Sequence, residues 1–400
     1  MRPGTPGFVG ERLRAAREAR GIPSAAALAE MLGVSRAAVS QYENGQQTPS
    51  PDVMHAISTV LNLPLQHFLI PVPVDNGVHF FRSLLSATQL MRNRAQRKYE
   101  WVTRIVSLLQ DHVHFPEVDF PPLISSADPT TTSTEDVEAA ALSLRRHWGI
   151  GLGPISNVVA LGENHGAVVV RLDMDSEKLD AFSRWNDLDN KPYVILGTNK
   201  GAAARSRFNA AHEFAHMVLH RRVPSSEFSR KPIFNEIESQ ANRFAGAFLL
   251  PRESFMCDLH PSMSLDAFKM LKPKWKVSIA LMLKRAEDLG VVSPDRARQL
   301  WINLARRGWK RDEPLESSVP IEQPQFLRRC FSLLTENEII LASDFPRLLA
   351  LGLTDIESLA NLDSGFLSEK ARDSMQEFPA ILKFPSNRSA GSSQTGEESE

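Results

Sequence analysis

The five residues His212-Glu213-Phe214-Ala215-His216 constrain this 400-residue chain more than any other feature. Residues four positions apart in a helix lie on one face, one turn apart, so both imidazoles can reach a single metal ion. Glu213 lies off that line, where its carboxylate can take a proton from an attacking water instead of binding the metal. This H-E-x-x-H arrangement is typical of zinc-dependent peptidases. The pattern therefore predicts two zinc ligands, His212 and His216, and a catalytic base, Glu213.

Apolar residues around the motif predict a helix over residues 205–220 that buries one face. His212 and His216 lie on the flank of the apolar stripe, which places a metal ion at the floor of a cleft. The alternative is a surface helix with two unconnected histidines, and the presence of a third ligand argues against it. His220 follows one turn later and is interpreted as a helix-end histidine, not as a ligand.

A second predicted helix, which ends before Pro251, supplies the third ligand. Glu238 borders its apolar stripe beside Ala241, whose small side chain allows a neighbouring helix to approach closely. Glu236 points to the opposite flank and ranks second. Asn242 lies one turn after Glu238 and can hydrogen-bond a ligand histidine. Two histidines and one carboxylate leave a fourth position for water, which is the catalytic form of a zinc site and not the closed structural form.

Several separate motifs occur in one order along this part of the chain. They are residues 208–216, Glu238-x-x-Ala241-Asn242-x-Phe244-Ala245, Leu249-Leu250-Pro251, and the upstream runs 180–183 and 192–196. In this order they resemble the ImmA/IrrE family of metallopeptidases, over roughly residues 136–270. The resemblance implies zinc bound by His212, His216 and Glu238, with Glu213 catalytic. It also implies that the substrate is a transcriptional repressor whose cleavage relieves repression under stress.

Residues 8–69 predict five short helices. Ser24, Ser35 and Ser50 are expected to cap three of them, and glycine ends the second and third. Two helices joined by a tight glycine turn, the second short and capped, are what a helix-turn-helix requires. In the first helix the apolar residues face inward, and four arginines are expected to face outward: Arg12, Arg14, Arg17 and Arg20.

This segment resembles the XRE/Cro-type helix-turn-helix domains. The resemblance rests on Leu28-Ala29-x-x-Leu32-Gly33-Val34-Ser35 and on Val39-Ser40-x-Tyr42-Glu43-Asn44-Gly45. It implies that Arg36, Ala37 and Gln41 face base edges and that Asn44 faces a phosphate of a double-stranded DNA operator. Arginine can pair with guanine and glutamine with adenine through two hydrogen bonds each. The alternative is a protein-interaction domain of the same fold.

Two features of the segment weaken its expected affinity for DNA. Ala25 and Ala26 stand where the family often has a backbone-contacting glutamine. Residues 1–70 carry six arginines against five acidic residues, a net charge of only +1. Because phosphate neutralisation supplies much of the binding energy, tight binding is expected to need a homodimer.

Residues 272–311 form a basic region, with eleven Lys or Arg against three acidic residues and with Trp275, Trp301 and Trp309. Tryptophan can stack on bases and cations bind phosphates, so one interpretation is a second nucleic-acid contact. The other interpretation is a solvated basic face on a helical subdomain.

The remaining sequence predicts a mainly α fold with a small β-sheet, containing a helix-turn-helix domain, a zincin-like peptidase domain and a helical C-terminal part. Helix is expected within 80–109, 135–148 and 265–309, and strands at 158–161, 167–172 and 193–196. The expected domains are 1–70 (DNA binding), 71–135 (helical segment and Pro/Ser/Thr-rich linker), 136–270 (peptidase), 271–384 (basic helical region) and 385–400 (disordered tail).

Composition excludes several classes of protein. The chain is 42% hydrophobic with a net charge of −1, and it has no apolar run long enough to span a membrane and no signal-peptide core. Its two cysteines, without a C-x-x-C pair, predict neither a disulfide framework nor a cysteine-based zinc site. A cytoplasmic protein with no membrane partner is expected.

Two functional hypotheses remain. In the first, the protein is a transcriptional regulator with a DNA-tethered zinc endopeptidase that cleaves a repressor, either itself or one encoded nearby. In the second, it is a DNA-binding regulator whose zinc domain is structural or sensory and cuts nothing. Glu213 between the two histidines favours the enzyme, because a structural zinc site does not need that carboxylate.

Overall fold

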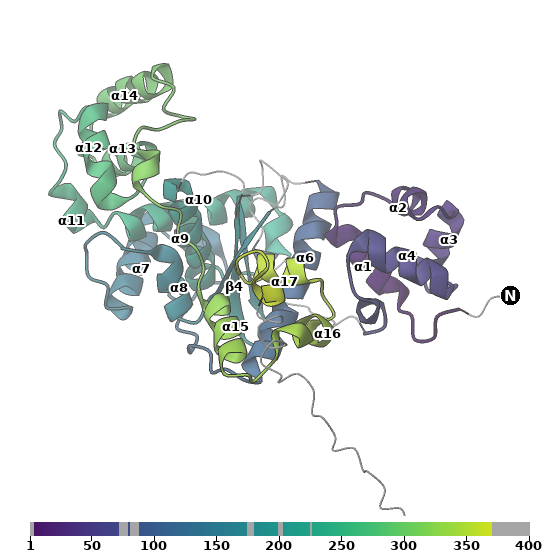
Figure 1. The fold of residues 1–400 in the computed structure, drawn as a ribbon. Helices are drawn as coiled ribbons and strands as arrows, with labels where there is room; N and C mark the ends of the chain where they lie inside the picture. The colour runs from purple at the N-terminus through teal and green to yellow at the C-terminus, as the bar shows by residue number, and fades with distance from the viewer. Residues whose placement is uncertain are drawn as a thin grey trace, which may run out of the picture.

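A computed structural model describes residues 4–71, 79–80, 88–173, 180–198, 203–224 and 226–369. The fold is mainly helical with a small sheet, as the sequence predicts (Figure 1). The tail predicted to be disordered, residues 385–400, lies outside the described residues. Within the described ranges, no helix is both long and apolar enough to cross a membrane.

The N-terminal domain has the capped helices that the sequence predicts. The hydroxyl oxygens of Ser24, Ser35 and Ser50 each accept a hydrogen bond from the backbone of the helix that follows. Gly33 ends the second helix with φ 66°, in the left-handed region that glycine tolerates. The elements are α1 (Gly10–Ala19), α2 (Ala25–Leu32), α3 (Arg36–Glu43), α4 (Pro51–Leu61) and the 3-10 helix η1 (Leu65–Phe68).

Four strands form one sheet in the order β1-β3-β4-β2. β2 pairs with β4 in parallel, whereas β3 pairs with β4 and with β1 in antiparallel register. The sequence predicted β2 and β4 but not β3. It also did not predict β1, because a helix was expected to begin at residue 80. The strands are β1 (His79–Phe80), β2 (Val168–Leu172), β3 (Ala181–Asn186) and β4 (Lys191–Gly197).

The strand predicted at residues 158–161 is wrong, because this segment lies within α8 (Val158–Asn164). The Asn157 side chain accepts a hydrogen bond from the backbone of Ala160. The carboxylate of Glu322 accepts bonds of 2.9 and 3.2 Å from the first two backbone amides of the helix. Glu322 lies far along the chain, so this stabilisation of a short, valine-rich helix could not be read from the local sequence.

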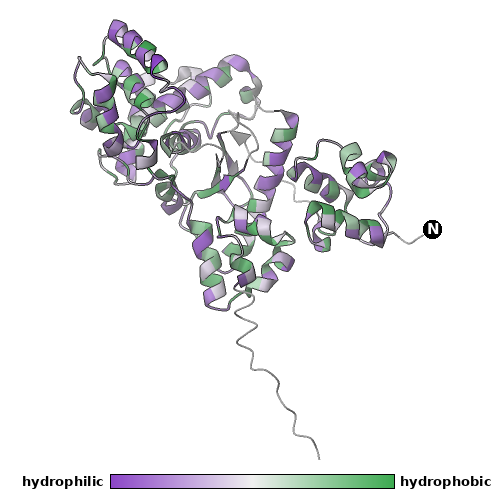
Figure 2. Ribbon diagram, turned by 45° about the horizontal axis from the view of Figure 1, so that its top comes forward, coloured by the Kyte–Doolittle hydropathy of each residue, from purple (hydrophilic) through white to green (hydrophobic). Residues whose placement is uncertain are grey.

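Both faces of the sheet are covered. Side chains alternate along a strand, so β3 sends Ala181, Ser183 and Trp185 to one face and Phe182 and Arg184 to the other. The helices carry apolar residues toward these cores and polar residues outward (Figure 2). The first face packs against α7 (Thr134–His147), α9 (Ala203–Leu219) and α10 (Lys231–Leu249), and the second against α6 (Gln89–Gln110), α15 (Phe326–Glu336), α16 (Phe345–Leu349) and α17 (Leu353–Leu359).

Residues 116–133, which the composition predicts to be a linker, pack against the first core. Phe120 is buried and contacts Trp148 and Phe214 edge to face. The backbone of Leu123 donates a hydrogen bond of 2.8 Å to the carbonyl of Val218 in α9. The segment contains a short 3-10 helix, η2 (Pro129–Thr131), and is part of the domain that holds the H-E-x-x-H helix.

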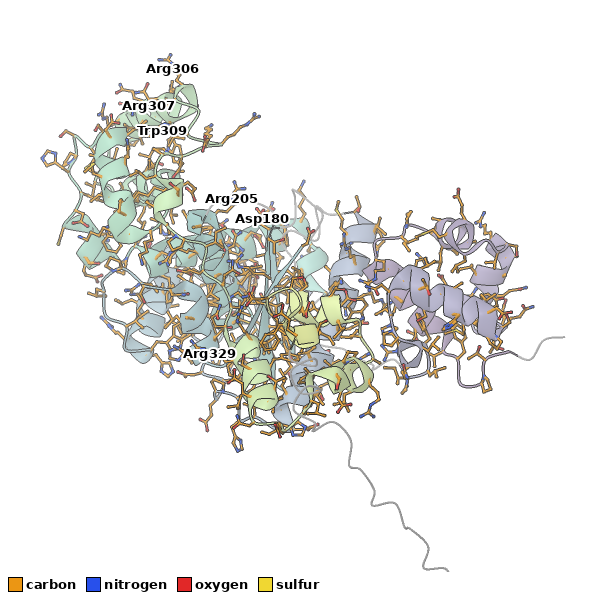
Figure 3. All side chains as sticks on the ribbon, in the orientation of Figure 1. Asp180, Arg205, Arg306, Arg307, Trp309 and Arg329 are labelled. Atoms are coloured by element: carbon orange, nitrogen blue, oxygen red, sulfur yellow. The ribbon has the colours of Figure 1, made fainter. Side chains whose placement is uncertain are left out.

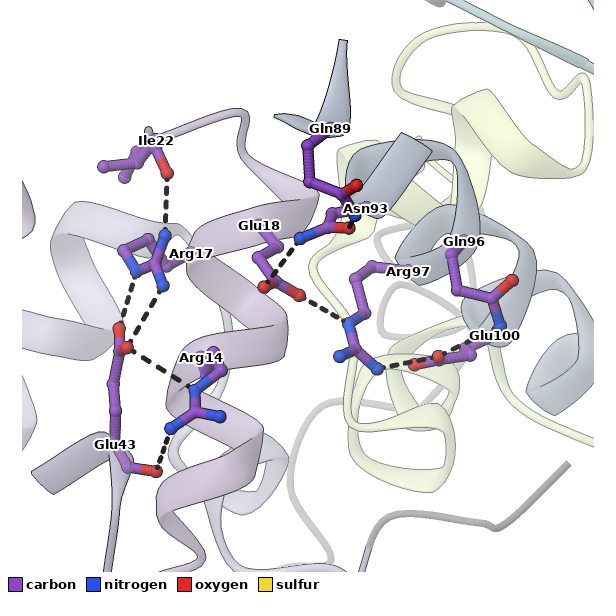
Figure 4. Close-up of polar contacts among 10 residues, drawn as sticks. All are labelled: Arg14, Arg17, Glu18, Ile22, Glu43, Gln89, Asn93, Gln96, Arg97 and Glu100. Atoms are coloured by element: carbon purple, nitrogen blue, oxygen red, sulfur yellow. Dashed lines mark hydrogen bonds and ion pairs between the residues drawn. The ribbon is translucent and has the colours of Figure 1, made fainter. Parts of the chain in front are cut away.

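The N-terminal domain is docked on α6 through α1. Glu18 accepts hydrogen bonds from Asn93 (3.0 Å) and from Arg97 (2.8 Å) of α6 (Figure 4). Arg20 pairs with the buried Asp355 of α17 at 2.6 Å, and Lys98 reaches the same carboxylate. Burial alone would raise the pKa of Asp355, but these two cations outweigh burial and lower it.

This docking contradicts the expectation that the arginines of α1 all face outward. Arg12 is buried and binds the carbonyls of Ile70 and Pro71. Arg17 is buried and forms an ion pair of 2.6 Å with Glu43. These guanidinium groups hold the domain together because each finds a fixed carbonyl or carboxylate nearby.

A separate helical lobe follows α10 (Figure 1). Part of the positive charge of the basic region is neutralised within the fold, since Lys272 is fully buried between Glu313 and Glu316, and Arg285 pairs with Glu138. Trp275 is also buried. Arg306 and Arg307 lie at the far end of the lobe, near Trp309 (Figure 3). The elements are α11 (Arg252–Met256), α12 (Leu265–Trp275), α13 (Ile279–Asp288) and α14 (Pro294–Arg306).

Candidate metal centre

Three predicted ligands lie together where α9 packs against α10. The Nε2 atoms of His212 and His216 are 3.1 Å apart. The carboxylate of Glu238 lies 3.6 Å from the first of these nitrogens and 3.7 Å from the second. All three side chains are buried, and their ligand atoms lie within 4.8 Å of one another. Ala241 is fully buried in α10, where its small side chain lets the two helices approach.

Glu236, the second-ranked carboxylate, lies elsewhere. Its side chain accepts a hydrogen bond of 2.9 Å from the amide of Gln240, and it is not part of the buried group of potential ligands found among the described residues. Asn242 lies where the sequence predicts, with its Oδ1 3.1 Å from Nδ1 of His212. An amide oxygen can only accept, so His212 carries its proton on Nδ1 and leaves the Nε2 lone pair for a metal.

A residue of the sheet holds Glu213 in position. It is 3% exposed, and its Oε2 accepts a hydrogen bond of 2.6 Å from the hydroxyl of Ser183 in β3. Ser183 was noticed in the sequence only as part of the run 180–183 and not as a site residue. Its role becomes visible once β3 is known to be a strand, because alternation then places residue 183 on the α9 face.

His220 has a closer relation to the site than the sequence interpretation gave it. It is fully buried, with its Nδ1 3.0 Å from Nδ1 of His216 and its Nε2 3.1 Å from Oε1 of Gln240. Burial lowers the pKa of His220 to about 4, although the hydrogen bond to Gln240 acts in the opposite direction. The imidazole is therefore neutral at physiological pH.

The positions of the protons on His216 and His220 can be assigned by starting from Gln240. The amide nitrogen of Gln240 donates to the carbonyl of Pro129 at 2.7 Å and to Glu236, so the Gln240 oxygen faces His220. That oxygen accepts from Nε2–H of His220, which leaves Nδ1 of His220 as an acceptor. His216 must then donate from its own Nδ1, and its Nε2 lone pair is directed at the metal position.

A cavity of about 500 Å³ opens beside the centre. Phe208 and Asn242 line it, and both also contact His212. Its other walls come from α7, α10 and α13. α9 also packs closely against α8. Gly162 of α8 lies against Phe214 of α9, and a Cβ at this glycine would stand 2.5 Å from the ring. That close packing fixes the rotation of α9 about its axis and so the direction of both histidines.

The candidate DNA-contacting residues lie on α3 and at its C-cap, Asn44, on the side of the N-terminal domain away from α6 (Figure 1). Arg36, Ala37 and Asn44 are exposed, and Gln41 is half-buried. The Asn44 side chain accepts a hydrogen bond from Arg14 of α1, which orients it. The exposed face of α3 is therefore accessible to a groove of DNA while α1 is docked on α6.

The hydrogen-bond chain predicts that His220 contributes to metal affinity without touching the metal. We expect His220→Ala to weaken binding of zinc roughly 10–100-fold, because His216 loses the acceptor that fixes its tautomer. His220→Gln keeps an acceptor for His216 and should retain most of the affinity. Competition with a fluorescent zinc chelator measures the effect. The exposed His260 provides the control as His260→Ala, and equal affinities of the His220→Ala and parent proteins would contradict the assignment.

Comparison with protein families finds a match in each of the two regions. Residues 13–68 match the model of the helix-turn-helix family, and residues 163–287 match the model of the IrrE N-terminal-like peptidase domain. No curated protein matches the chain. The two matches contain α3 and the buried His212–His216–Glu238 group, respectively. The chain is thus a fusion of an XRE-type helix-turn-helix domain with a metallopeptidase-like domain of the IrrE type.

Proposed function

We propose that this protein is a transcriptional regulator that binds an operator in double-stranded DNA and cleaves a repressor protein with a zinc-dependent endopeptidase domain. The observation that carries the enzymatic part is the position of Glu213. This buried carboxylate is held by Ser183 from the sheet, on the same helix as His212 and His216. A domain that bound zinc only for stability would not need a carboxylate positioned there.

The donor set fits zinc. Tetrahedral zinc with bonds of about 2.0–2.2 Å keeps its ligand atoms roughly 3.3–3.6 Å apart. The ligand atoms of His212, His216 and Glu238 are separated by 3.1, 3.6 and 3.7 Å, so small shifts would satisfy this geometry. Two imidazoles and one carboxylate leave one coordination position for water or a substrate carbonyl.

The protein's own residues supply the proton transfers of peptide hydrolysis. Zinc, when bound, provides the Lewis acid that polarises the peptide carbonyl and acidifies water. Glu213 accepts a proton from the attacking water on one carboxylate oxygen while Ser183 holds the other. Glu213 then passes that proton to the nitrogen of the leaving amine, and the peptide C–N bond breaks. His220 and Asn242 keep the two ligand imidazoles in the required tautomer.

The DNA-binding part of the proposal includes a homodimer. Arg12, Arg17 and Arg20 bind groups of the protein itself, which leaves the domain with little positive charge for phosphates. Two copies on adjacent half-sites would double the phosphate contacts and the number of bases that α3 can read. The exposed Arg36 and the half-buried Gln41 supply the side chains suited to guanine and adenine.

Glu213→Gln should retain zinc and the fold but lose about 10²–10⁴-fold in cleavage rate, because an amide cannot accept the proton of water. The assay incubates the zinc-loaded protein with repressors encoded beside its gene and detects fragments by mass spectrometry. Glu135→Gln, at an exposed position of α7, is the matched control. Equal cleavage by Glu213→Gln would refute the catalytic role of this residue, and absence of cleavage by the parent protein would favour a structural or sensory zinc domain.

Zinc stoichiometry distinguishes the two candidate carboxylates of α10. We expect one zinc per chain in the parent protein and in Glu236→Ala, because Glu236 lies outside the buried group. Glu238→Ala, His212→Ala and His216→Ala should each lose stoichiometric zinc, since two remaining ligands hold the ion weakly. Metal analysis of dialysed protein gives the stoichiometry. Full zinc occupancy in Glu238→Ala together with loss of zinc in Glu236→Ala would show that Glu236, and not Glu238, is the ligand.

DNA recognition by α3 is tested by separating base contacts from phosphate contacts. Arg36→Ala and Gln41→Ala should each relax sequence preference, at a cost of roughly 1–3 kcal/mol of discrimination. Asn44→Ala should weaken all sequences alike, because a phosphate contact carries no sequence information. Selection from a random duplex library, followed by titration of selected and scrambled duplexes, measures both effects. Unchanged preference in both base-contact variants would favour the protein-interaction domain.

A further inference from the structure

The outer edge of β3 is paired with a piece of the chain's own interdomain connection. β1 (His79–Phe80) comes between the DNA-binding domain and α6, and it pairs with β3 in antiparallel register. His79 lies opposite Arg184, and Phe80 lies opposite Ser183. Among the described strands β1 is the end strand of the sheet, and it pairs with the edge of β3 that does not pair with β4.

This edge belongs to the metal centre. Ser183, the residue opposite Phe80, is the same residue whose hydroxyl lies 2.6 Å from the carboxylate of Glu213. A backbone paired with β3 therefore runs next to the proton acceptor of the proposed reaction. Addition of a strand to a sheet edge holds a peptide through main-chain hydrogen bonds, which is a general mode of peptide recognition.

The two ends of the connection are docked on the same helix, α1. Arg12 of α1 binds the carbonyls of Ile70 and Pro71 at the end of the DNA-binding domain. Glu18 of the same helix binds Asn93 near the start of α6. Arg12 and Glu18 are about 9 Å apart along a helix. Residues 72–87 make sixteen positions, which can span roughly 50 Å when extended, so their number is sufficient for His79 and Phe80 to pair with β3.

We propose that the segment carrying His79 and Phe80 is a peptide substrate of the metal centre, cut within the same molecule. This inference rests on the proposed function and names one substrate of it. Hydrolysis breaks one peptide C–N bond of this segment. The hydroxyl of a water molecule is added to the carbonyl carbon, and Glu213 carries the remaining proton of that water to the amine nitrogen. The cut severs the chain between the DNA-binding domain and the peptidase domain, and no further reactant is needed.

The cut leaves the two products associated. Glu18 of the N-terminal product still binds Asn93 and Arg97, and Arg20 still binds Asp355. The two products also share a buried apolar core, in which the ring of His67 packs against Trp101. Cleavage thus converts a covalent attachment of the N-terminal domain into a non-covalent one.

The experiment uses the full-length, zinc-loaded protein and intact-mass spectrometry over time. We expect products of about 80 and about 320 residues, formed at a rate independent of protein concentration because the reaction is intramolecular. Glu213→Gln should yield neither product. The double variant His79→Pro/Phe80→Pro removes two backbone N–H donors of the segment and should slow the cut by on the order of tenfold or more. His79→Ala/Phe80→Ala keeps both donors and is the matched control.

The outcomes separate this inference from the proposed function. If the full-length chain stays intact while a repressor encoded beside its gene is cut, the segment is not a substrate, although the peptidase is active. If the proline variant then cuts that repressor faster than its parent, the segment is an inhibitor, which overturns the inference. A cut elsewhere in the chain, or one that the proline pair does not slow, overturns it as well. If neither protein is cut, the proposed function itself fails.

Discussion

The alternation of side chains along β3 is the constraint on which the rest of the structure depends. Ser183 faces α9 and holds Glu213, whereas its neighbour Arg184 faces α6, where it contacts Gln96 and lies over the ring of Tyr99. One strand therefore fixes the carboxylate of Glu213 on one face of the sheet and the helix on which the N-terminal domain is docked on the other. A shift of register by one residue would exchange the two faces and lose both contacts.

Local patterns in the sequence were sufficient for the helices of both candidate sites. Serine caps, glycine stops and the spacing of apolar residues act within one or two turns, and they predicted α1 to α4, α7, α9 and α10. The position of Glu238 beside Ala241 follows the same helical period. Elements whose stability comes from distant residues were missed. α8 is capped by Glu322, and β3 carries Ser183 and Arg184 where a buried strand would be expected to be apolar.

His220 shows why a residue can be located from the sequence while its role is not. Its position one turn after His216 predicts that it lies on the same side of α9. The partner that determines its proton is Gln240 of α10, which is itself oriented by the carbonyl of Pro129. That chain of bonds joins three separate segments, and Pro129 belongs to the stretch whose composition suggested a linker. Only the packing of all three segments defines the tautomer of His216.

Charge counting was the least reliable guide, for a physical reason. A guanidinium or ammonium group near a fixed carboxylate or carbonyl becomes part of the fold and is no longer available for phosphates. In the lobe this applies to Lys272 and Arg285, and in the DNA-binding domain to Arg12, Arg17 and Arg20. Arg12 and Arg17 bind groups of the N-terminal domain itself, whereas Arg20 links α1 to α17 of the metallopeptidase-like body. The proposed binding to an operator therefore relies on the side chains of α3 and on the proposed pairing of two copies, and it does not require α1 to leave α6.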